Sequence, residues 1–375
     1  MINSDLVMQM KVKVGDITKI KTGKLDANAS SPDGKYPFFT CSKDPLKINT
    51  YSYDCECVLV AGNGDLNVKY YNGKFDAYQR TYIIEDNSNG LLYVPYLYYF
   101  LEGYIEELRK QSIGGVIKYI KLDNLTDALI ELPSVEEQKY IVNLMNTSSE
   151  LIDLRRETIN KLDSLVKARF VEMFGDIHDN DSEFDVVTIE DVCSLIKDGT
   201  HQTPQYIENK EEGYKFLSSK DVMSQKIDWT NMKYIPAELH KKLYASIKPR
   251  RNDILMSKNG VNYGVAAVND TDEVFDIYVS LALLRPKPII NPIFFRCVIN
   301  NPGTKRQFDS NIKGIGVPNL HLREIKKTRI ILPPMELQNE FVSFVQQVDK
   351  SKLAVQQSLE KTQQLFDSLM QEYFG

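Results

Sequence analysis

The sequence predicts a duplicated α/β chain, in which two mixed α+β heads are each followed by a long helix. The first observation is a repeat, because residues 332–375 match residues 132–175 at a constant offset of 200. The second is that the segments before these repeats share short motifs but differ in length. The third is a seven-residue apolar period inside both repeats, which is typical of paired helices. Together they predict two tandem globular domains on two long antiparallel helices, with pseudo-twofold symmetry.

The repeat also predicts the domain boundaries. We expect the first head over residues 1–131 and the first helix with its linker over 132–185. The second head is expected over residues 186–331 and the second helix over 332–375. A chain of 375 residues leaves each head long enough for its own core. Because the heads share a frame but differ in most residues, we expect one scaffold with two specificities.

Short motifs recur in the two heads. Residues 20–23 (IKTG) correspond to 196–199 (IKDG), and both heads carry a short apolar run followed by an Asn-Gly pair, at Asn63-Gly64 and Asn259-Gly260. The apolar runs predict strands, and Asn-Gly is the pair that tolerates positive φ in a turn. The aromatic run of residues 93–100 predicts a packed helix.

The composition predicts a cytoplasmic protein. The hydrophobic fraction of 42% is ordinary, and neither a membrane span nor a secretory leader is expected. The five cysteines, of which only Cys55 and Cys57 are close in sequence, are expected to be free thiols. No metal site is predicted, because the four histidines are dispersed without ligand spacing.

The charge is divided unevenly along the chain. The total is −5, but the second head carries 22 basic and 16 acidic residues, whereas the first head has 15 and 17. Both helical segments are acidic. This partition favours heads that meet a polyanion and helices that meet protein, although a solvated surface explains the same charge.

The helices are predicted from heptads, which place Met145, Ile152, Ile159 and Val166 on one seam and Val345, Leu359 and Phe366 on the other. Arg155 and Lys352 also fall on the seam, which favours a short antiparallel pair over a self-standing coiled coil. Prolines at the entry and glycines at the exit agree with helix start and stop chemistry. About 40 residues give a rod of roughly 60 Å.

Two LPxxExQ entries (residues 132–138 and 332–338), helices ending in MFG and YFG, and two divergent heads resemble the specificity subunit of Type I restriction-modification enzymes. The resemblance implies that each head is a target recognition domain that reads half of a bipartite, asymmetric site in double-stranded DNA. It also implies that the helices form a spacer and dock two methylation subunits, which two restriction subunits join. S-adenosylmethionine, ATP and Mg are then expected on the partner subunits, and this chain is expected to bind no cofactor.

Candidate DNA contacts combine cations, amides and phenols near the predicted turns. They are Lys21, Asn63, Lys69, Tyr71, Arg80 and Lys118 in the first head, and Lys197, Lys258, Asn259, Tyr263 and Lys313 in the second. Two interpretations of the Asn-Gly turns stay open, since they either present polar groups to a groove or only close hairpins. The glycine-bearing turns at Gly114 and Gly314 similarly fit phosphate contact or a plain connection.

Candidate residues for subunit docking and for the spacer lie on the two helices. They are Glu136, Gln138, Ile152, Ile159 and Val166 on the first helix, and Glu336, Gln338, Val348, Leu359 and Phe366 on the second.

The sequence bears on two other functions. An intrinsic DNA adenine methyltransferase needs a glycine-rich turn and an N-P-P-[FY] loop, but the chain has only Gly62-Asn63-Gly64 in one head and Asn291-Pro292-Ile293-Phe294 in the other. No Walker A motif is present, so ATP hydrolysis is assigned to a partner.

A structural coiled-coil adaptor without DNA affinity would explain the helices but not two unequal heads. No catalytic residue is predicted.

Overall fold

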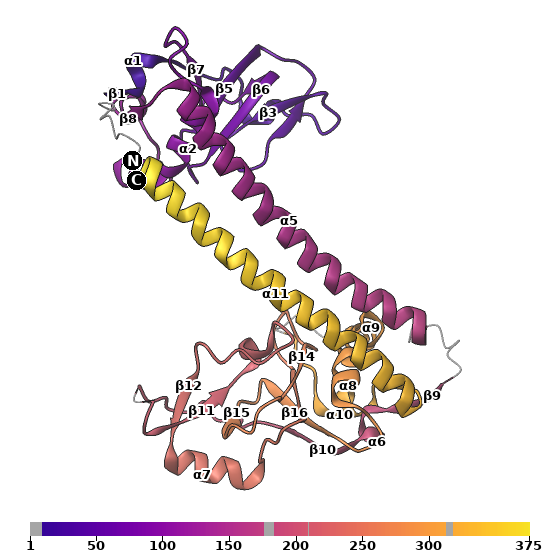
Figure 1. The fold of residues 1–375 in the computed structure, drawn as a ribbon. Coiled ribbons are helices and arrows are strands. Elements are labelled where there is room, and N and C mark those ends of the chain that lie inside the picture. The colour runs from indigo at the N-terminus through magenta and orange to yellow at the C-terminus, as the bar shows by residue number, and fades with distance from the viewer. Residues whose placement is uncertain (1–9, 176–183, 209, 313–317) are drawn as a thin grey trace, which may run out of the picture. The chain divides into compact units, whose positions relative to one another are not determined.

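The computed structural model describes residues 10–175, 184–208, 210–312 and 318–375. It divides into two compact units, and each contains one head together with one end of each long helix. Unit 1 comprises residues 1–158 and 355–375, and unit 2 comprises residues 159–354. Mixed α/β heads joined by long helices agree with the predicted fold class (Figure 1).

Head one is built on a six-stranded sheet in the order β2-β7-β5-β6-β3-β4, in which only β3 and β6 are parallel. A separate antiparallel pair, β1 and β8, joins the start of the head to the strand that precedes the long helix. The strands are β1 (Met10–Lys13), β2 (Thr18–Thr22), β3 (Tyr36–Phe39), β4 (Leu46–Ile48), β5 (Tyr53–Ala61), β6 (Val68–Ala77), β7 (Thr81–Asp86) and β8 (Leu129–Leu132). The helices are α1 (Val14–Ile17), η1 (Ala27–Ala29), α2 (Val94–Gly103), α3 (Ile105–Gln111) and α4 (Leu122–Thr126).

The core of head one lies on both faces of β5. Val58 and Val60 pack toward α2, whereas Cys57 and Leu59 pack into a second cluster with Phe75 on the opposite face. A strand covered on both faces reads as a continuous apolar run, which is why the sequence predicted a strand here. The predicted aromatic helix is confirmed as α2, whose residues Tyr96, Leu97 and Phe100 are buried.

Head two has a similar plan, but its strands are divided among separate, smaller sheets. One sheet has the order β10-β16-β13-β14, a second has the order β12-β11-β15, and β9 pairs with β17. The strands are β9 (Asp185–Thr188), β10 (Cys193–Asp198), β11 (Gly213–Leu217), β12 (Lys233–Pro236), β13 (Ile254–Ser257), β14 (Ala266–Val268), β15 (Phe275–Ile277), β16 (Leu281–Pro286) and β17 (Arg329–Leu332). The helices are α6 (Ile189–Val192), η2 (Ser219–Val222), α7 (Ala237–Ser246), α8 (Pro292–Ile299), α9 (Pro302–Asn311) and α10 (Leu322–Lys327). The segment that is continuous as β6 in head one is therefore divided between β14 and β15.

The two long helices are α5 (Val135–Phe174) and α11 (Met335–Phe374), each of 40 residues. Within unit 1, Arg155 Nη1 of α5 donates to the carbonyl of Ser358 on α11 at 3.1 Å. Within unit 2, Lys352 Nζ lies 2.6 Å from the Asp163 carboxylate. Further along α5 in the same unit, Arg169 lies 2.9 Å from Glu340 near the start of α11, so the predicted antiparallel pairing is confirmed there. Arg155 and Lys352, the two cations on the predicted seam, both make polar contacts across it.

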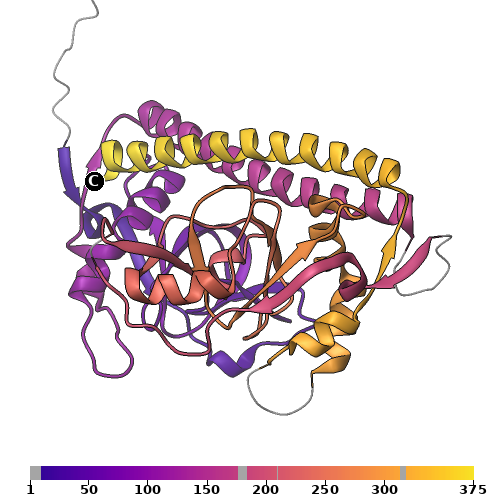
Figure 2. The same cartoon turned by 90° about the horizontal axis from the view of Figure 1, so that it is seen from below.

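The C-terminal end of α11 is packed into head one. Phe374 lies 5.1 Å from Tyr96 of α2, measured between ring centroids, and both views show this end of the helix beside the head (Figures 1 and 2). The five cysteines are free thiols. Among the residues with a described position, none of the helices combines the length and apolar character needed to cross a bilayer.

Candidate nucleic-acid interface

A glycine in the motif shared by both heads lets two backbone segments cross. A Cβ on Gly23 would lie 2.2 Å from the carbonyl oxygen of Ala77, and a Cβ on Gly199 would lie 2.0 Å from that of Ile277. Both distances are below any tolerable contact, so only glycine fits. In head one the crossing brings the end of β2 against the connection that enters β7. In head two it brings the end of β10 against the connection that enters β16. In both heads the crossing lies at the end where the Asn-Gly turn is found.

In head one the Asn-Gly turn belongs to what we call loop pair 1, residues 62–67 and 112–120. Residues 62–67 connect the antiparallel strands β5 and β6. The Gly64 amide donates to the carbonyl of Lys118 at 2.9 Å, and the Ile120 amide donates to that of Gly62 at 3.0 Å. The turn therefore closes a hairpin and also holds a second loop beside it, while its contact with a groove stays a prediction.

Head two contains the same arrangement, loop pair 2, formed by residues 258–265 and 318–320. The Gly260 amide donates to the carbonyl of Pro318 at 3.1 Å, and the Leu320 amide donates to that of Lys258 at 2.9 Å. The matching bonds show that the backbone frame is shared although the loop sequences differ.

Loop pair 1 gathers three of the predicted DNA contacts. The Gly62 amide donates to the carbonyl of Arg80 at 2.7 Å, which places Arg80 beside Asn63, and Lys118 lies on the facing loop. Arg80 and Lys118 are exposed, and within the described part of the chain their side chains form no hydrogen bond or ion pair. Two unpaired cations on a preformed loop are suited to phosphate contact.

The other candidates in head one are engaged within the protein. Lys69 is half-buried, its ammonium donates to Asn67, and desolvation lowers its pKa. Lys21 forms an ion pair with Glu85 and lies over the ring of Tyr53. Tyr71 packs against the rings of Phe39 and Phe75, 5.1 Å and 5.6 Å away. These three residues support the sheet rather than extend from it.

The structure corrects two predictions in head two. Lys258 is 4% exposed and its ammonium lies 2.7 Å from the carboxylate of Asp198, so it is not a free phosphate partner. Tyr263 is 8% exposed, donates its hydroxyl hydrogen to Asp309, and carries the ammonium of Lys305 3.4 Å from its ring centroid. Both side chains turn toward a carboxylate of the protein, Asp198 at the end of β10 for Lys258 and Asp309 on α9 for Tyr263.

The remaining candidates of head two differ from one another. Lys197 is exposed and donates to the carbonyl of Ser246 at 3.3 Å. Asn259 is half-buried, and its side-chain oxygen Oδ1 is buried without a hydrogen-bond donor among the residues described. Lys313 lies outside the described residues.

The glutamines of the two LPxxExQ motifs bind their own heads. Gln138 accepts from the Tyr93 amide at 2.8 Å and donates to the carbonyls of Leu91 and Pro133. Gln338 accepts from the Asn291 amide at 2.8 Å and donates to the carbonyls of Ile289 and Pro333. Both side chains are fully buried, which replaces the docking role expected from the sequence with an internal one.

The other helix candidates divide by exposure. Glu136 and Glu336 are exposed in the first turns of α5 and α11. The seam residues are buried or half-buried: Ile152, Ile159, Val166, Val348, Leu359 and Phe366. Sequence reasoning missed the apolar side chains that stay exposed on the helices, including Tyr140 and Leu154 on α5 and Leu353 and Leu365 on α11, each at least 53% exposed.

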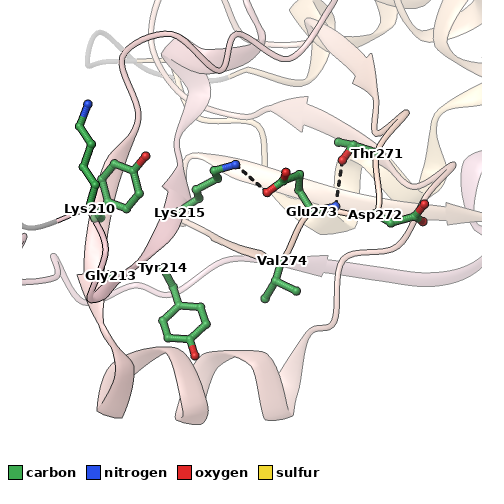
Figure 3. Close-up of a pocket in the computed structure, with 9 residues that line it drawn as sticks. Lys210, Gly213, Tyr214, Lys215, Thr271, Asp272, Glu273 and Val274 are labelled. Carbon is green, nitrogen blue, oxygen red and sulfur yellow. Dashed lines mark hydrogen bonds and ion pairs between the residues drawn. The ribbon is translucent and has the colours of Figure 1, made fainter.

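Head two also contains a hollow of about 660 Å³ that the sequence did not predict (Figure 3). The ammonium of Lys215 lies 2.6 Å from the carboxylate of Glu273 among its lining residues. Lys215 also lies over the ring of Trp229, so its charge is already satisfied. The residues that the structure describes include no cluster of three or more histidine, cysteine, aspartate or glutamate side chains able to bind a metal ion.

The family model of the Type I restriction modification DNA specificity domain matches residues 8–164 and 181–364. The chain is 33% identical over 225 residues to the Type I restriction enzyme EcoDI specificity subunit of Escherichia coli, covering 60% of this chain and 47% of that one. It is 22% identical over 367 residues to the MjaVIII specificity subunit of Methanocaldococcus jannaschii, covering 90% of this chain and 85% of that one. The chain thus spans about half the length of the EcoDI relative.

A solved structure has the same fold. The S subunit of the Type I restriction-modification system from M. genitalium superposes with a TM-score of 0.62 at 18% identity, covering 100% of this chain and 98% of that chain.

Proposed function

The chain belongs to the Type I restriction modification DNA specificity domain family, and from this premise we propose that it is a DNA-recognition subunit without catalysis of its own. Head one and head two each read one half of a bipartite, asymmetric site. Adenine methylation and ATP-dependent cleavage are carried out by methylation and restriction subunits, which bind S-adenosylmethionine, ATP and Mg.

The observation that carries this proposal is the pair of matching loop frames on two unlike heads. Loop pair 1 and loop pair 2 share the bonds from Gly64 to Lys118 and from Gly260 to Pro318, yet their side chains differ. A shared backbone with different side chains is what two readers of different half-sites require, because base edges are discriminated by side-chain chemistry.

The long helices are suited to partner docking. Tyr140 is 60% exposed and Leu154 58% exposed on α5, and Leu353 is 56% exposed on α11. Exposed apolar side chains on a helix that is already paired along its seam favour a protein partner. Two methylation subunits, joined by two restriction subunits, are the partners we propose for this surface.

The surroundings of Asn291 argue against the methyltransferase alternative. Asn291 caps α8 by accepting from the Ile293 amide at 2.9 Å, and Phe294 is fully buried in the core. A loop that grips a flipped base must leave such groups free. The adaptor alternative lacks a reason for two preformed loop pairs, the first of which carries the exposed cations Arg80 and Lys118.

The test is coexpression of the chain with its cognate methylation subunit, followed by mapping of modified adenines in the host genome. We expect one bipartite motif with a constant gap. The purified chain alone, incubated with DNA and labelled S-adenosylmethionine, should transfer no label. Label transfer by the chain alone, or methylation without a shared motif, would contradict the proposal.

A further inference from the structure

The tip of residues 112–120 in loop pair 1 exposes apolar side chains. Val116 is 104% exposed relative to its reference, Ile117 is 62% exposed, and Ile113 and Tyr119 are 42% and 39% exposed. Single exposed apolar residues are common, but several on one short tip form a contiguous patch, which indicates a contact surface.

The tip has a fixed shape. The Ile113 amide donates to the carbonyl of Tyr119 at 3.0 Å, and the Tyr119 amide donates back at 2.9 Å. Gly114 has a φ of +119°, and a Cβ there would lie 2.6 Å from the carbonyl oxygen of Ile117. Glycine therefore allows the tight return that holds Val116 and Ile117 away from the core. A preordered tip loses little conformational entropy on binding.

The charges beside the tip identify its occupant. Lys118 follows Ile117 directly, and Arg80 is held beside Gly62 at the base of loop pair 1. The nearby carboxylate of Asp65 lies 3.1 Å from Arg109, which offsets its charge. An apolar tip flanked by two free cations is complementary to a nucleic-acid groove, where phosphates border the base edges.

We propose that Val116 and Ile117 contact the C5 methyl group of thymine in the major groove of the half-site read by head one. Their side chains have no hydrogen-bond donor or acceptor, so apolar contact is their only means of discrimination. Thymine alone among the four bases presents a methyl group in that groove. Arg80 and Lys118 bind the adjoining phosphates. The inference rests on the proposed function, because it names a specificity contact within it.

The inference is confined to head one. Among the described residues of loop pair 2 the exposed apolar side chain is Val261, 84% exposed, and it lies on the other member of the pair. Val261 therefore serves as a matched control of similar exposure in the head that reads the other half-site.

The experiment uses the complex of this chain with its methylation subunit and a duplex carrying the mapped motif. Each thymine is replaced in turn by deoxyuridine, which removes one methyl group and no hydrogen-bonding group. We expect a loss of about fourfold in affinity at one or two positions of a single half-site, as for the loss of one buried methyl group. The V116A/I117A variant should bind the thymine duplex more weakly and no longer respond to deoxyuridine at those positions. The V261A variant should keep the full response there.

Three results would overturn the inference: no deoxyuridine response in the wild type, an undiminished response in V116A/I117A, or a response lost equally in V261A. Val116→Ser alone provides a second variant. Because Val116 is exposed, this replacement should not disturb folding, and a change in DNA binding then reports the contact itself. Failure of the proposed function is recognised earlier and separately, because the wild-type complex would then yield no methylated motif from which to build the duplex.

Discussion

Head one and head two place different side chains on the same backbone frame. At the end of the central strand head one has Gly62, whose amide donates to the carbonyl of Arg80, and head two has Lys258, whose amide donates to that of Ser280. The backbone bond is the same, but one head leaves cations exposed while the other buries a lysine against Asp198. Backbone pairing tolerates a change of side chain, so the frame is retained while the surface varies.

A buried aspartate shows the same principle inside the heads. Asp76 and Asp276 occupy the same register opposite Phe38 and Phe216 in the parallel strand pairs. In head one the carboxylate of Asp76 accepts from the Ser52 hydroxyl at 3.1 Å. In head two Asp276 lies 2.7 Å from Nδ1 of His240 on α7. Burial raises the pKa of Asp276, and the histidine opposes that rise.

The ring of His240 in turn stacks on Tyr214, with centroids 3.6 Å apart. Helix α7 thus supplies a partner, His240, for the aspartate that both heads have at this position. Each head therefore keeps the aspartate of the common frame and satisfies it with a different local partner.

The largest effect should come from the glycines at the backbone crossing. Gly23→Ala and Gly199→Ala should each destabilise their own head by about 3 kcal/mol, because the added Cβ collides with a carbonyl oxygen. The single tryptophan, Trp229, lies in head two, so urea unfolding followed by its fluorescence should detect Gly199→Ala and not Gly23→Ala. Hydrogen exchange of the strand amides reports head one.

Gly115→Ala is the control for this pair, since no neighbouring atom lies within 4 Å of its Cβ position. A loss of stability in only one of the two heads would show that the backbone crossing is not equally important in both.

The next effect concerns the buried glutamines. Gln138→Ala and Gln338→Ala should each lower the free energy of unfolding by about 2 kcal/mol, because a buried amide and two carbonyls lose their partners. Chemical denaturation of the full chain, with hydrogen exchange at Tyr93 and Asn291, measures the change. The exposed Gln347 of α11 provides a control, whose replacement by alanine should have little effect. Markedly unequal losses would indicate that the two junctions differ.

A smaller effect should be confined to head two. Lys258→Met removes the cation but keeps the buried stem, and it should cost about 1.5 kcal/mol, as for the loss of one hydrogen bond between charged groups. The Trp229 fluorescence transition is the readout. Lys197→Met is the exposed control and should leave the transition in place. An unchanged midpoint in Lys258→Met would show that the pair does not stabilise the head.

The smallest effect should appear in the salt dependence of DNA binding. Arg80→Gln and Lys118→Gln should each reduce the slope of log K against log salt concentration by about 0.9, as for one phosphate contact. Lys258→Met should leave the slope unchanged, because its ammonium is already paired within the protein. Affinity measured on the complex over a range of salt concentrations gives the slopes. An equal decrease in the slope for all three variants would show that Lys258 contributes to DNA binding as Arg80 and Lys118 do, which would contradict the difference between the loop pairs.

Local patterns in the sequence predicted much of the backbone. The offset of 200 and the heptads predicted the helices found at Val135–Phe174 and Met335–Phe374, and Arg155 and Lys352 on the seam predicted antiparallel pairing. The Asn-Gly pairs predicted turns, which the structure places in the hairpin connections. These features were readable because periodicity and turn chemistry act between residues that are close in the chain.

Local sequence patterns did not predict which polar side chains are exposed. Lys258 was predicted to face a phosphate, but its partner Asp198 lies 60 residues earlier. Tyr263 is buried by a contact with Asp309, 46 residues later. Gln138 satisfies an amide 45 residues before it. None of these pairings leaves a local signature.

The duplication, the helix pair and the family resemblance could all be predicted before the structure, since each depends on spacing along the chain. That Arg80, Asn63 and Lys118 meet at one loop pair, and that Val116 and Ile117 remain outside the core, emerged only from the packing of the chain. Burial depends on which distant segments pack together, and local spacing does not specify this. A side chain becomes a contact surface only when that packing leaves it without a partner.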